Sequence, residues 1–157
     1  MSAHKAPRIA PLLPRIDLLK LNGFEAEALL GAPVRDEAEA HAAAEALAAR
    51  GVRQVVLSLG ARGAAWAERG DAPRSGFEPA LAVDPATVRS TSGAGDALLA
   101  GLVHGLLGAG PIEAALRFAQ GCAALTLQAD GANHPGLSVA AVKGLPGAGP
   151  GREPLAG

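Results

Sequence analysis

Short apolar runs alternate along the chain with longer segments that have a helical pattern. Residues 16–21 (IDLLKL) and 54–59 (QVVLSL) are almost continuously apolar, which is typical of strands that are buried in a sheet. Between them, Asp36 with Glu39 three residues later predicts a capped helix start, and Gly51 predicts the helix end. Strands and helices in this order indicate an α/β fold, with a mostly parallel sheet and helices on both faces.

The remaining pattern predicts further elements on both sides of this unit. A short helix is expected at residues 6–13, another at 25–30, a turn at 60–63, strands at 64–68 and 77–83, and a loop at 70–75. Later helices are expected from residue 93 to about Leu107, from Pro111 to about Gln128, and after Ser138. Pro79 would place its strand at a sheet edge. The Gly- and Pro-rich residues 144–157 predict a disordered tail, so residues 1–143 are expected to form the domain.

Composition and charge narrow the classes of function. The chain has 157 residues, 49% of them hydrophobic, and a formal net charge of −1 without a block of one sign. A nucleic-acid surface would show a basic patch, so that class of partner is not expected. Cys122 is the only cysteine, which rules out an internal disulfide and suits a reducing cytoplasm. The sequence has no apolar run long enough to span a membrane and no signal-peptide core, so we expect a cytoplasmic protein.

Residues 90–96 (STSGAGD) carry the clearest chemistry, because they stand at the start of an apolar helix. Free amide groups and the positive end of the dipole favour an anion there, and Gly93, Ala94 and Gly95 would let it approach the backbone. Asp96 would repel a phosphate but could act as a general base beside it. This layout suits phosphoryl transfer without a Walker A lysine. The alternative is an ordinary acidic residue near a helix start.

Three motifs in order resemble the PfkB (ribokinase-like) family of carbohydrate kinases. STSGAGD resembles the family signature DTxGAGD, Asn22-Gly23-Phe24-Glu25 resembles its NxxE motif, and residues 58–63 (SLGARG) resemble its nucleotide-binding turn. Each of the last two has a plainer interpretation: a helix-capping Asn with a solvated Glu, and a simple hairpin. The resemblance extends over residues 2–142. It implies a three-layer, Rossmann-like fold, of which this chain would be a C-terminal part without the lid.

Softer likenesses point to the pseudouridine kinase subgroup of that family. These are residues 118–122 (FAQGC), residues 133–138 (NHPGLS) and residues 2–6 (SAHKA). The resemblance would place Gln120 and Asn133 near the nucleotide base; a polar residue on a partly exposed helix is the alternative for Gln120. Cys122 is expected to be a small core residue, and His104 a surface or satisfied core histidine rather than a catalyst.

The resemblance also implies roles for single residues in an ATP-dependent kinase. Asp96 would be the general base, the amides of Gly93, Ala94 and Gly95 would hold the transferred phosphoryl group, and Ser58, Gly60 and Gly63 would line the nucleotide pocket. Asn22 and Glu25 would position Mg²⁺, largely through its waters. Ser90 stands where the family has the Asp that helps to bind an activating monovalent cation, which weakens the case for that ion.

Members of this family have roughly double this length, and the acceptor-binding residues belong mainly to the half that has no counterpart here. Two explanations stand side by side. Met1 can be a misassigned start inside a longer kinase that acts on a sugar or nucleoside, with pseudouridine preferred. Alternatively the chain is a true half: a non-catalytic nucleotide-binding module, one part of a two-chain enzyme, or a self-associating half that forms a homodimer through the exposed edge of residues 16–21. The partner otherwise expected is a small sugar or nucleoside substrate.

Overall fold

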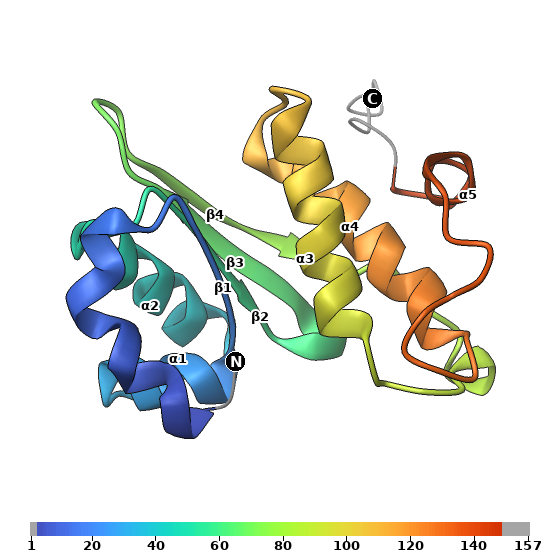
Figure 1. Ribbon diagram of the computed structural model, residues 1–157, viewed down its shortest axis with the longest axis horizontal. Helices are drawn as coiled ribbons and strands as arrows, with labels where there is room; N and C mark the ends of the chain where they lie inside the picture. Colours follow the sequence, from blue (N-terminus) through green and yellow to red (C-terminus); the bar gives the residue numbers. More distant parts are fainter. Residues whose placement is uncertain (1–2, 149–157) are drawn as a thin grey trace, which may run out of the picture. The chain divides into compact units, whose positions relative to one another are not determined.

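The computed structural model describes residues 3–148 (Figure 1). The chain divides into two compact units, Met1–Ala80 and Leu81–Gly157. All four strands of the described residues belong to the first unit, and the second contributes helices and loops.

The first unit contains one sheet in the order β1-β2-β3-β4. Its strands are β1 (Leu18–Asn22), β2 (Gln54–Ser58), β3 (Gly63–Glu68) and β4 (Arg74–Pro79). β1 and β2 are parallel, whereas β2–β3 and β3–β4 are antiparallel, so the described sheet is mixed rather than mostly parallel. The reason is the length of the connections, since only the β1–β2 connection contains the helices that a parallel crossover needs.

Two α-helices connect β1 to β2, α1 (Gly23–Leu30) and α2 (Glu37–Ala49), and they form a core with the sheet. Alternate residues of the two parallel strands, Leu19, Leu21, Val55 and Leu57, are buried in one cluster with Leu47 of α2. The small alanine side chains of α2 allow this helix to lie close to the sheet (Figure 1). This core holds β1 and β2 in place, so that the chain leaves both strands at the same edge of the sheet.

The segment before β1 is a 3-10 helix, η1 (Ala3–Arg15), longer and tighter than the short helix predicted at residues 6–13. Pro7, Pro11 and Pro14 lie inside it, and proline has no amide proton to donate to an α-helical hydrogen bond. Gly51 allows a close approach, because a Cβ at this position would lie 2.8 Å from the Cα of Pro14.

The start of α2 differs in one detail from its prediction. Asp36 caps the helix as expected, and its Oδ1 accepts a hydrogen bond of 2.8 Å from the Glu39 amide. The Glu39 carboxylate, however, accepts from the amide of Arg35 at 2.7 Å, one residue before the cap. The capping box predicted here is therefore only half formed.

The last strand lies earlier in the sequence than predicted. β4 spans Arg74–Pro79, whereas the pattern predicted a loop at residues 70–75 and a strand at 77–83. Arg74 pairs in register with Glu68, and its guanidinium lies 5.4 Å from the ring centroid of Trp66. These cross-strand contacts extend β4 toward its amino end, and Pro79 ends it because proline cannot donate to the ladder.

The second unit is built around two helices, α3 (Ala94–Leu107) and α4 (Ile112–Leu127), with η3 (Pro85–Thr87) before them and α5 (Val139–Lys143) after them. Two glycines bring α3 and α4 together. A Cβ at Gly101 would lie 2.8 Å from the Sγ of Cys122, and one at Gly105 would lie 2.7 Å from the Cα of Ala115. Cys122 is buried, as predicted, and the exposed ring of His104 lies 5.1 Å from that of Phe118.

Part of the predicted tail can be compared with the structure. Leu145 and Ala148 pack in a cluster with Cys122 and Val142. Residues 149–157 lie outside the described residues, so the disordered tail and the domain boundary at residue 143 stay predictions.

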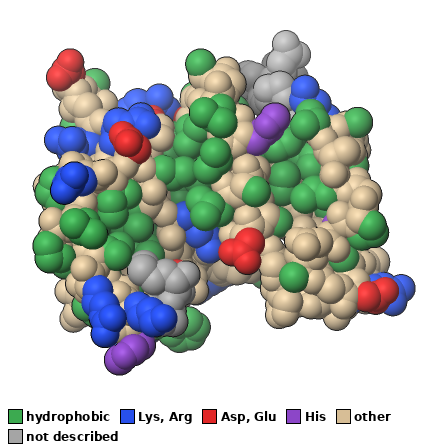
Figure 2. Space-filling model, in the orientation of Figure 1, with side chains coloured by type: hydrophobic (Ala, Val, Ile, Leu, Met, Phe, Trp, Pro, Cys, Tyr) green, Lys and Arg blue, Asp and Glu red, His purple; other side chains and the backbone are tan. Residues whose placement is uncertain are grey.

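None of the helices within residues 3–148 is long and apolar enough to cross a membrane. Figure 2 shows one face of the molecule, on which Lys and Arg side chains stand in small separate groups among apolar and uncharged atoms.

Candidate active site

Two of the three sequence motifs lie at the same edge of the sheet in the first unit. Asn22 and Ser58 are register partners at the carboxyl ends of the parallel strands β1 and β2. The Ser58 hydroxyl donates a hydrogen bond of 3.3 Å to the carbonyl oxygen of Leu21. The NGFE and SLGARG segments therefore leave the sheet side by side, at the edge where ligands bind in many α/β proteins.

Asn22 and Glu25 form a complete capping box at the start of α1. The Asn22 Oδ1 accepts from the Glu25 amide at 2.9 Å, and the Glu25 Oε2 accepts from the Asn22 amide at 2.9 Å. Asn22 is thus a helix cap, which was the plainer interpretation of this motif. Glu25, in contrast, is only 5% exposed, and so is not the solvated carboxylate of that interpretation.

The turn after β2 depends on two glycines. Gly63 has a φ of +128°, and a Cβ there would overlap the carbonyl oxygen of Glu78 and lie 2.9 Å from the Cα of Pro79. Gly60 has a φ of +61°, with no atom within 4 Å of its Cβ position. The Leu59 amide closes the turn by donating 2.8 Å to the Gly63 carbonyl oxygen. Gly63 is therefore required by packing, whereas the Cβ position of Gly60 faces open space.

The third motif forms the amino end of α3 in the second unit. Gly93 is the N-cap residue with a φ of +80°, and no side chain caps the helix. α4 also has no side-chain cap, whereas α1, α2 and α5 are capped by Asn22, Asp36 and Ser138. The first-turn amides of α3, which begins at Ala94, therefore lack the side-chain oxygen that satisfies such groups in those helices. Asp96 lies in this first turn and is exposed.

The loop after α4 lies directly against this helix start. A Cβ at Gly93 would overlap the carbonyl oxygen of Ala132 and lie 2.7 Å from its carbonyl carbon. The amides of Arg89 and Ser90 both donate to the carbonyl oxygen of Leu127, at 2.8 and 3.3 Å. Two separate segments of the second unit are thus held together at the GAGD motif.

Asn133 lines a hollow of 350 Å³ in that loop. The other lining residues are Gln128, Ala129, Asp130, Gly131, His134 and Pro135. His134 was not predicted as a site residue from the sequence, although it stands inside the NHPGLS stretch. Its Nδ1 accepts a hydrogen bond of 3.1 Å from the Gly136 amide, so a neutral His134 carries its proton on Nε2. Gln120 is 6% exposed on α4 and does not line this hollow.

Residues 1–139 match the family profile described as pfkB family carbohydrate kinase. The chain belongs to the PfkB family. It is 32% identical over 145 residues to the pseudouridine kinase of Escherichia coli, which covers 92% of this chain and 45% of the relative. It is also 36% identical over 108 residues to a 1-phosphofructokinase of Haemophilus influenzae. This match covers 67% of this chain and 32% of the relative.

Solved structures of PfkB-like kinases support the same fold. The structure of Arabidopsis thaliana ribokinase complexed with ribose and ATP matches with a TM-score of 0.72 and 29% identity, over 85% of this chain and 41% of that one. The α/β, ribokinase-like class predicted from the sequence is confirmed, and so is its partial extent. The chain spans less than half the length of the relatives that it matches here.

The side chains that could approach Mg²⁺ are few. Among residues 3–148, no group of three or more His, Cys, Asp or Glu residues could hold a metal ion. Asn22 and Glu25 offer the oxygen atoms that Mg²⁺ prefers, and each of the capping-box oxygens already accepts one amide hydrogen bond. This donor set fits an ion that keeps its water shell and arrives with the phosphates, rather than an ion held directly by protein ligands.

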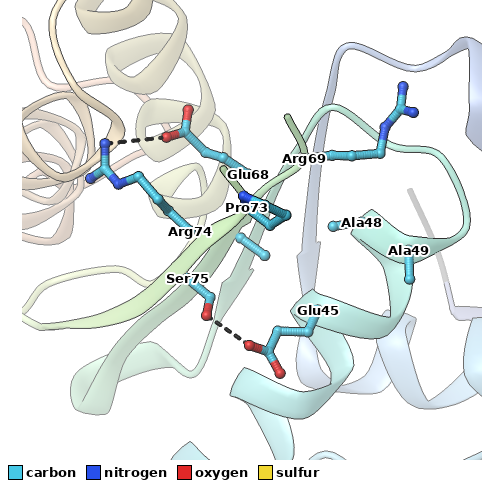
Figure 3. Close-up of a pocket in the computed structure, with 9 residues that line it drawn as sticks. Glu45, Ala48, Ala49, Glu68, Arg69, Pro73, Arg74 and Ser75 are labelled. Atoms are coloured by element: carbon cyan, nitrogen blue, oxygen red, sulfur yellow. Dashed lines mark hydrogen bonds and ion pairs between the residues drawn. The ribbon is translucent and has the colours of Figure 1, made fainter. Parts of the chain in front are cut away.

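Another hollow, of 230 Å³, lies at the opposite end of the PfkB sheet, between α2 and the β3–β4 hairpin (Figure 3). Both of its carboxylates interact with side chains that line it. Glu45 accepts a hydrogen bond of 2.7 Å from the Ser75 hydroxyl, and Glu68 lies 3.8 Å from the Arg74 guanidinium. Glu68 also accepts from Gln54 at 2.6 Å. These pairs have structural roles, and the hollow contains none of the motif residues.

Proposed function

We propose that this chain carries the nucleotide site and the catalytic base of an ATP-dependent kinase that phosphorylates a hydroxyl group of a sugar or nucleoside. Pseudouridine is the acceptor that we place first, and the 32% identity to the pseudouridine kinase of Escherichia coli supports this choice. The observation that carries the proposal is the start of α3, where glycine geometry replaces a side-chain cap and an acidic residue follows at once.

The start of α3 suits a transferred phosphoryl group. The positive end of the helix dipole and the first-turn amides of Ala94 and Gly95 favour an anion, while Gly93 leaves room for the Ala132 carbonyl group that packs against it. In the transition state the negative charge is spread over the phosphoryl oxygens, so donors that are already oriented stabilise it without reorganisation.

Asp96 is the general base in this proposal. Its carboxylate is exposed in the same first turn and can therefore reach a bound hydroxyl group. It would take the proton from that hydroxyl as the oxygen attacks the γ-phosphorus, while the bond to the leaving ADP oxygen breaks. Asp96 would thus hold the acceptor in line as well as activate it.

Two groups of residues are proposed for the nucleotide. Ser58, Gly60 and Gly63 form a turn with open space at Gly60, which leaves room for a nucleotide to approach the backbone. Asn133 lines a hollow beside the α3 start and offers an amide donor and acceptor for a base. Gln120 is kept as a candidate on the family resemblance alone, because it is buried on α4 outside this hollow. The Arabidopsis ribokinase was solved as a complex with ATP, which supports the choice of this nucleotide.

Mg²⁺, when bound with ATP, would neutralise charge on the β- and γ-phosphates. Asn22 and Glu25 would orient its waters from the start of α1. The Ser90 hydroxyl accepts a hydrogen bond of 3.1 Å from the Ser92 amide in the same loop. This local contact gives no support to a monovalent cation site at Ser90.

The test uses the longest native form of the protein and a panel of acceptors: pseudouridine, ribose and fructose 1-phosphate. ADP release with MgATP is measured for the wild type and for Asp96→Asn. We expect turnover with at least one acceptor, and a loss of roughly 10²–10⁴-fold in kcat for Asp96→Asn with ATP affinity nearly unchanged. Equal turnover in the two proteins would remove Asp96 from the mechanism. ATP binding without turnover on any acceptor would favour the non-catalytic nucleotide-binding module.

A further inference from the structure

Arg62 joins two segments that are far apart in the sequence. Its guanidinium donates a hydrogen bond to the carbonyl oxygen of Arg35, in the loop between α1 and α2. Its main chain is held as well, since its amide donates to the Leu59 oxygen at 3.4 Å and its carbonyl oxygen accepts from the Ala80 amide at 3.3 Å. Arg62 therefore connects the turn of residues 60–63 to the residue after β2, to the residue after β4 and to the α1–α2 loop.

The α1–α2 loop is itself fixed to both helices. The Val34 amide donates 2.9 Å to the Glu27 carboxylate of α1, and the Arg35 amide donates 2.7 Å to the Glu39 carboxylate of α2. The carbonyl oxygen of Val34 would lie only 3.0 Å from a Cβ at Gly23, the residue that follows Asn22. The loop that receives the Arg62 hydrogen bond thus packs against the start of α1.

These contacts form a continuous connection between the two motifs at the sheet edge. It runs from the 60–63 turn through the Arg62 guanidinium to Arg35, then through Val34 to Gly23 and the capping box. The turn needs such support, because Gly60 has a left-handed conformation and no neighbouring atom within 4 Å of its Cβ position. A glycine-containing turn without a tether has more conformational freedom, and a ligand that binds it must first order it.

We propose that Arg62 is a positioning residue that holds the 60–63 turn in its nucleotide-binding arrangement relative to the start of α1. The proposal rests on the nucleotide role of this turn, which is part of the proposed function. In this proposal Arg62 acts through the main chain of the turn, because its guanidinium donates to the Arg35 carbonyl oxygen.

Amide hydrogen exchange on the ligand-free chain tests the tether without any nucleotide. Three variants are compared with the wild type: Arg62→Ala, Arg62→Lys and the control Arg69→Ala. Arg69 is exposed on the β3–β4 connection at the other end of the sheet. We expect faster exchange in residues 60–63 and 34–36 for Arg62→Ala. We expect near-wild-type exchange for Arg62→Lys, whose ammonium can donate to the same carbonyl, and no change for Arg69→Ala. Unchanged exchange in Arg62→Ala would overturn the proposal.

MgATP affinity, measured by calorimetry on the same proteins, tests the functional part. We expect about a tenfold weaker Kd for Arg62→Ala, which corresponds to ~1.4 kcal/mol, partial recovery for Arg62→Lys and no change for Arg69→Ala. Recovered affinity in Arg62→Lys while its turn still exchanges fast would indicate a direct charge contact and would overturn the positioning role. If the wild type binds no ATP, the proposed function fails, and the exchange data alone decide whether Arg62 is a tether.

Discussion

The carbonyl group of Ala132 occupies the space that any side chain at position 93 would need. Gly93 also has a φ of +80°, which residues other than glycine rarely adopt. The backbone of the loop after α4 is thus packed on the α3 start, and Gly93 has a structural reason that is independent of any ligand. As a glycine, the N-cap residue Gly93 has no side chain with which to cap the first turn of α3.

Replacing Gly93 with alanine should destabilise the second unit. The left-handed backbone and the overlap with Ala132 together predict a loss of at least about 2 kcal/mol in the free energy of unfolding. Gly131→Ala is the matched control, since the same loop has no atom within 4 Å of that Cβ position and no left-handed φ there. Urea unfolding of both variants checks the prediction. Equal stability of the two would contradict the close packing at Gly93.

Asn22 should contribute to stability as well as to function. Asn22→Ala removes the side-chain acceptor at the start of α1 and is expected to lower the free energy of unfolding by about 1 kcal/mol. Asn22→Asp keeps a capping oxygen and should lose much less. Chemical denaturation separates the two outcomes. A wild-type midpoint for Asn22→Ala would show that the capping box of α1 contributes little.

The single thiol should react slowly in the folded protein. Burial between α3 and α4 raises the pKa of Cys122, and a backbone hydrogen bond opposes this only in part. Because the thiolate is the reactive form, alkylation by iodoacetamide at pH 8 should be at least roughly tenfold slower than in the denatured chain. Mass spectrometry of timed samples provides the rate. Alkylation of the folded protein at the denatured rate would mean that the thiol is accessible.

The position of the first two motifs could be predicted from the sequence because each follows an apolar run. Parallel pairing of such strands puts their carboxyl ends at one edge, and the register pair Asn22–Ser58 is the result. Local patterns also predicted the α2 cap at Asp36 and the start of α3 at the GAGD motif, because the start of a helix depends on residues within one turn.

Contacts over long separations could not be predicted in this way. No local pattern connects Arg62 to Arg35, or Gly93 to Ala132, because each contact depends on how separate loops pack. The boundaries of β4 were shifted for a related reason: its amino end is set by cross-strand partners, Glu68 for Arg74 and Trp66 for Gly76. Glu25 was expected to position magnesium, and its burial within a capping box became visible only in the structure.

Amide chemical shifts of the ¹⁵N-labelled chain during titration with MgATP test the proposed assignment of the nucleotide-binding residues. We expect saturable shifts at residues 58–63 and at Gly93, Ala94, Gly95 and Asp96, with further shifts near Asn133. The 230 Å³ hollow at the other end of the sheet, which includes Glu45 and Ser75, should show none. Absence of shifts at both motifs, or saturable shifts confined to that hollow, would contradict the assignment of the nucleotide site.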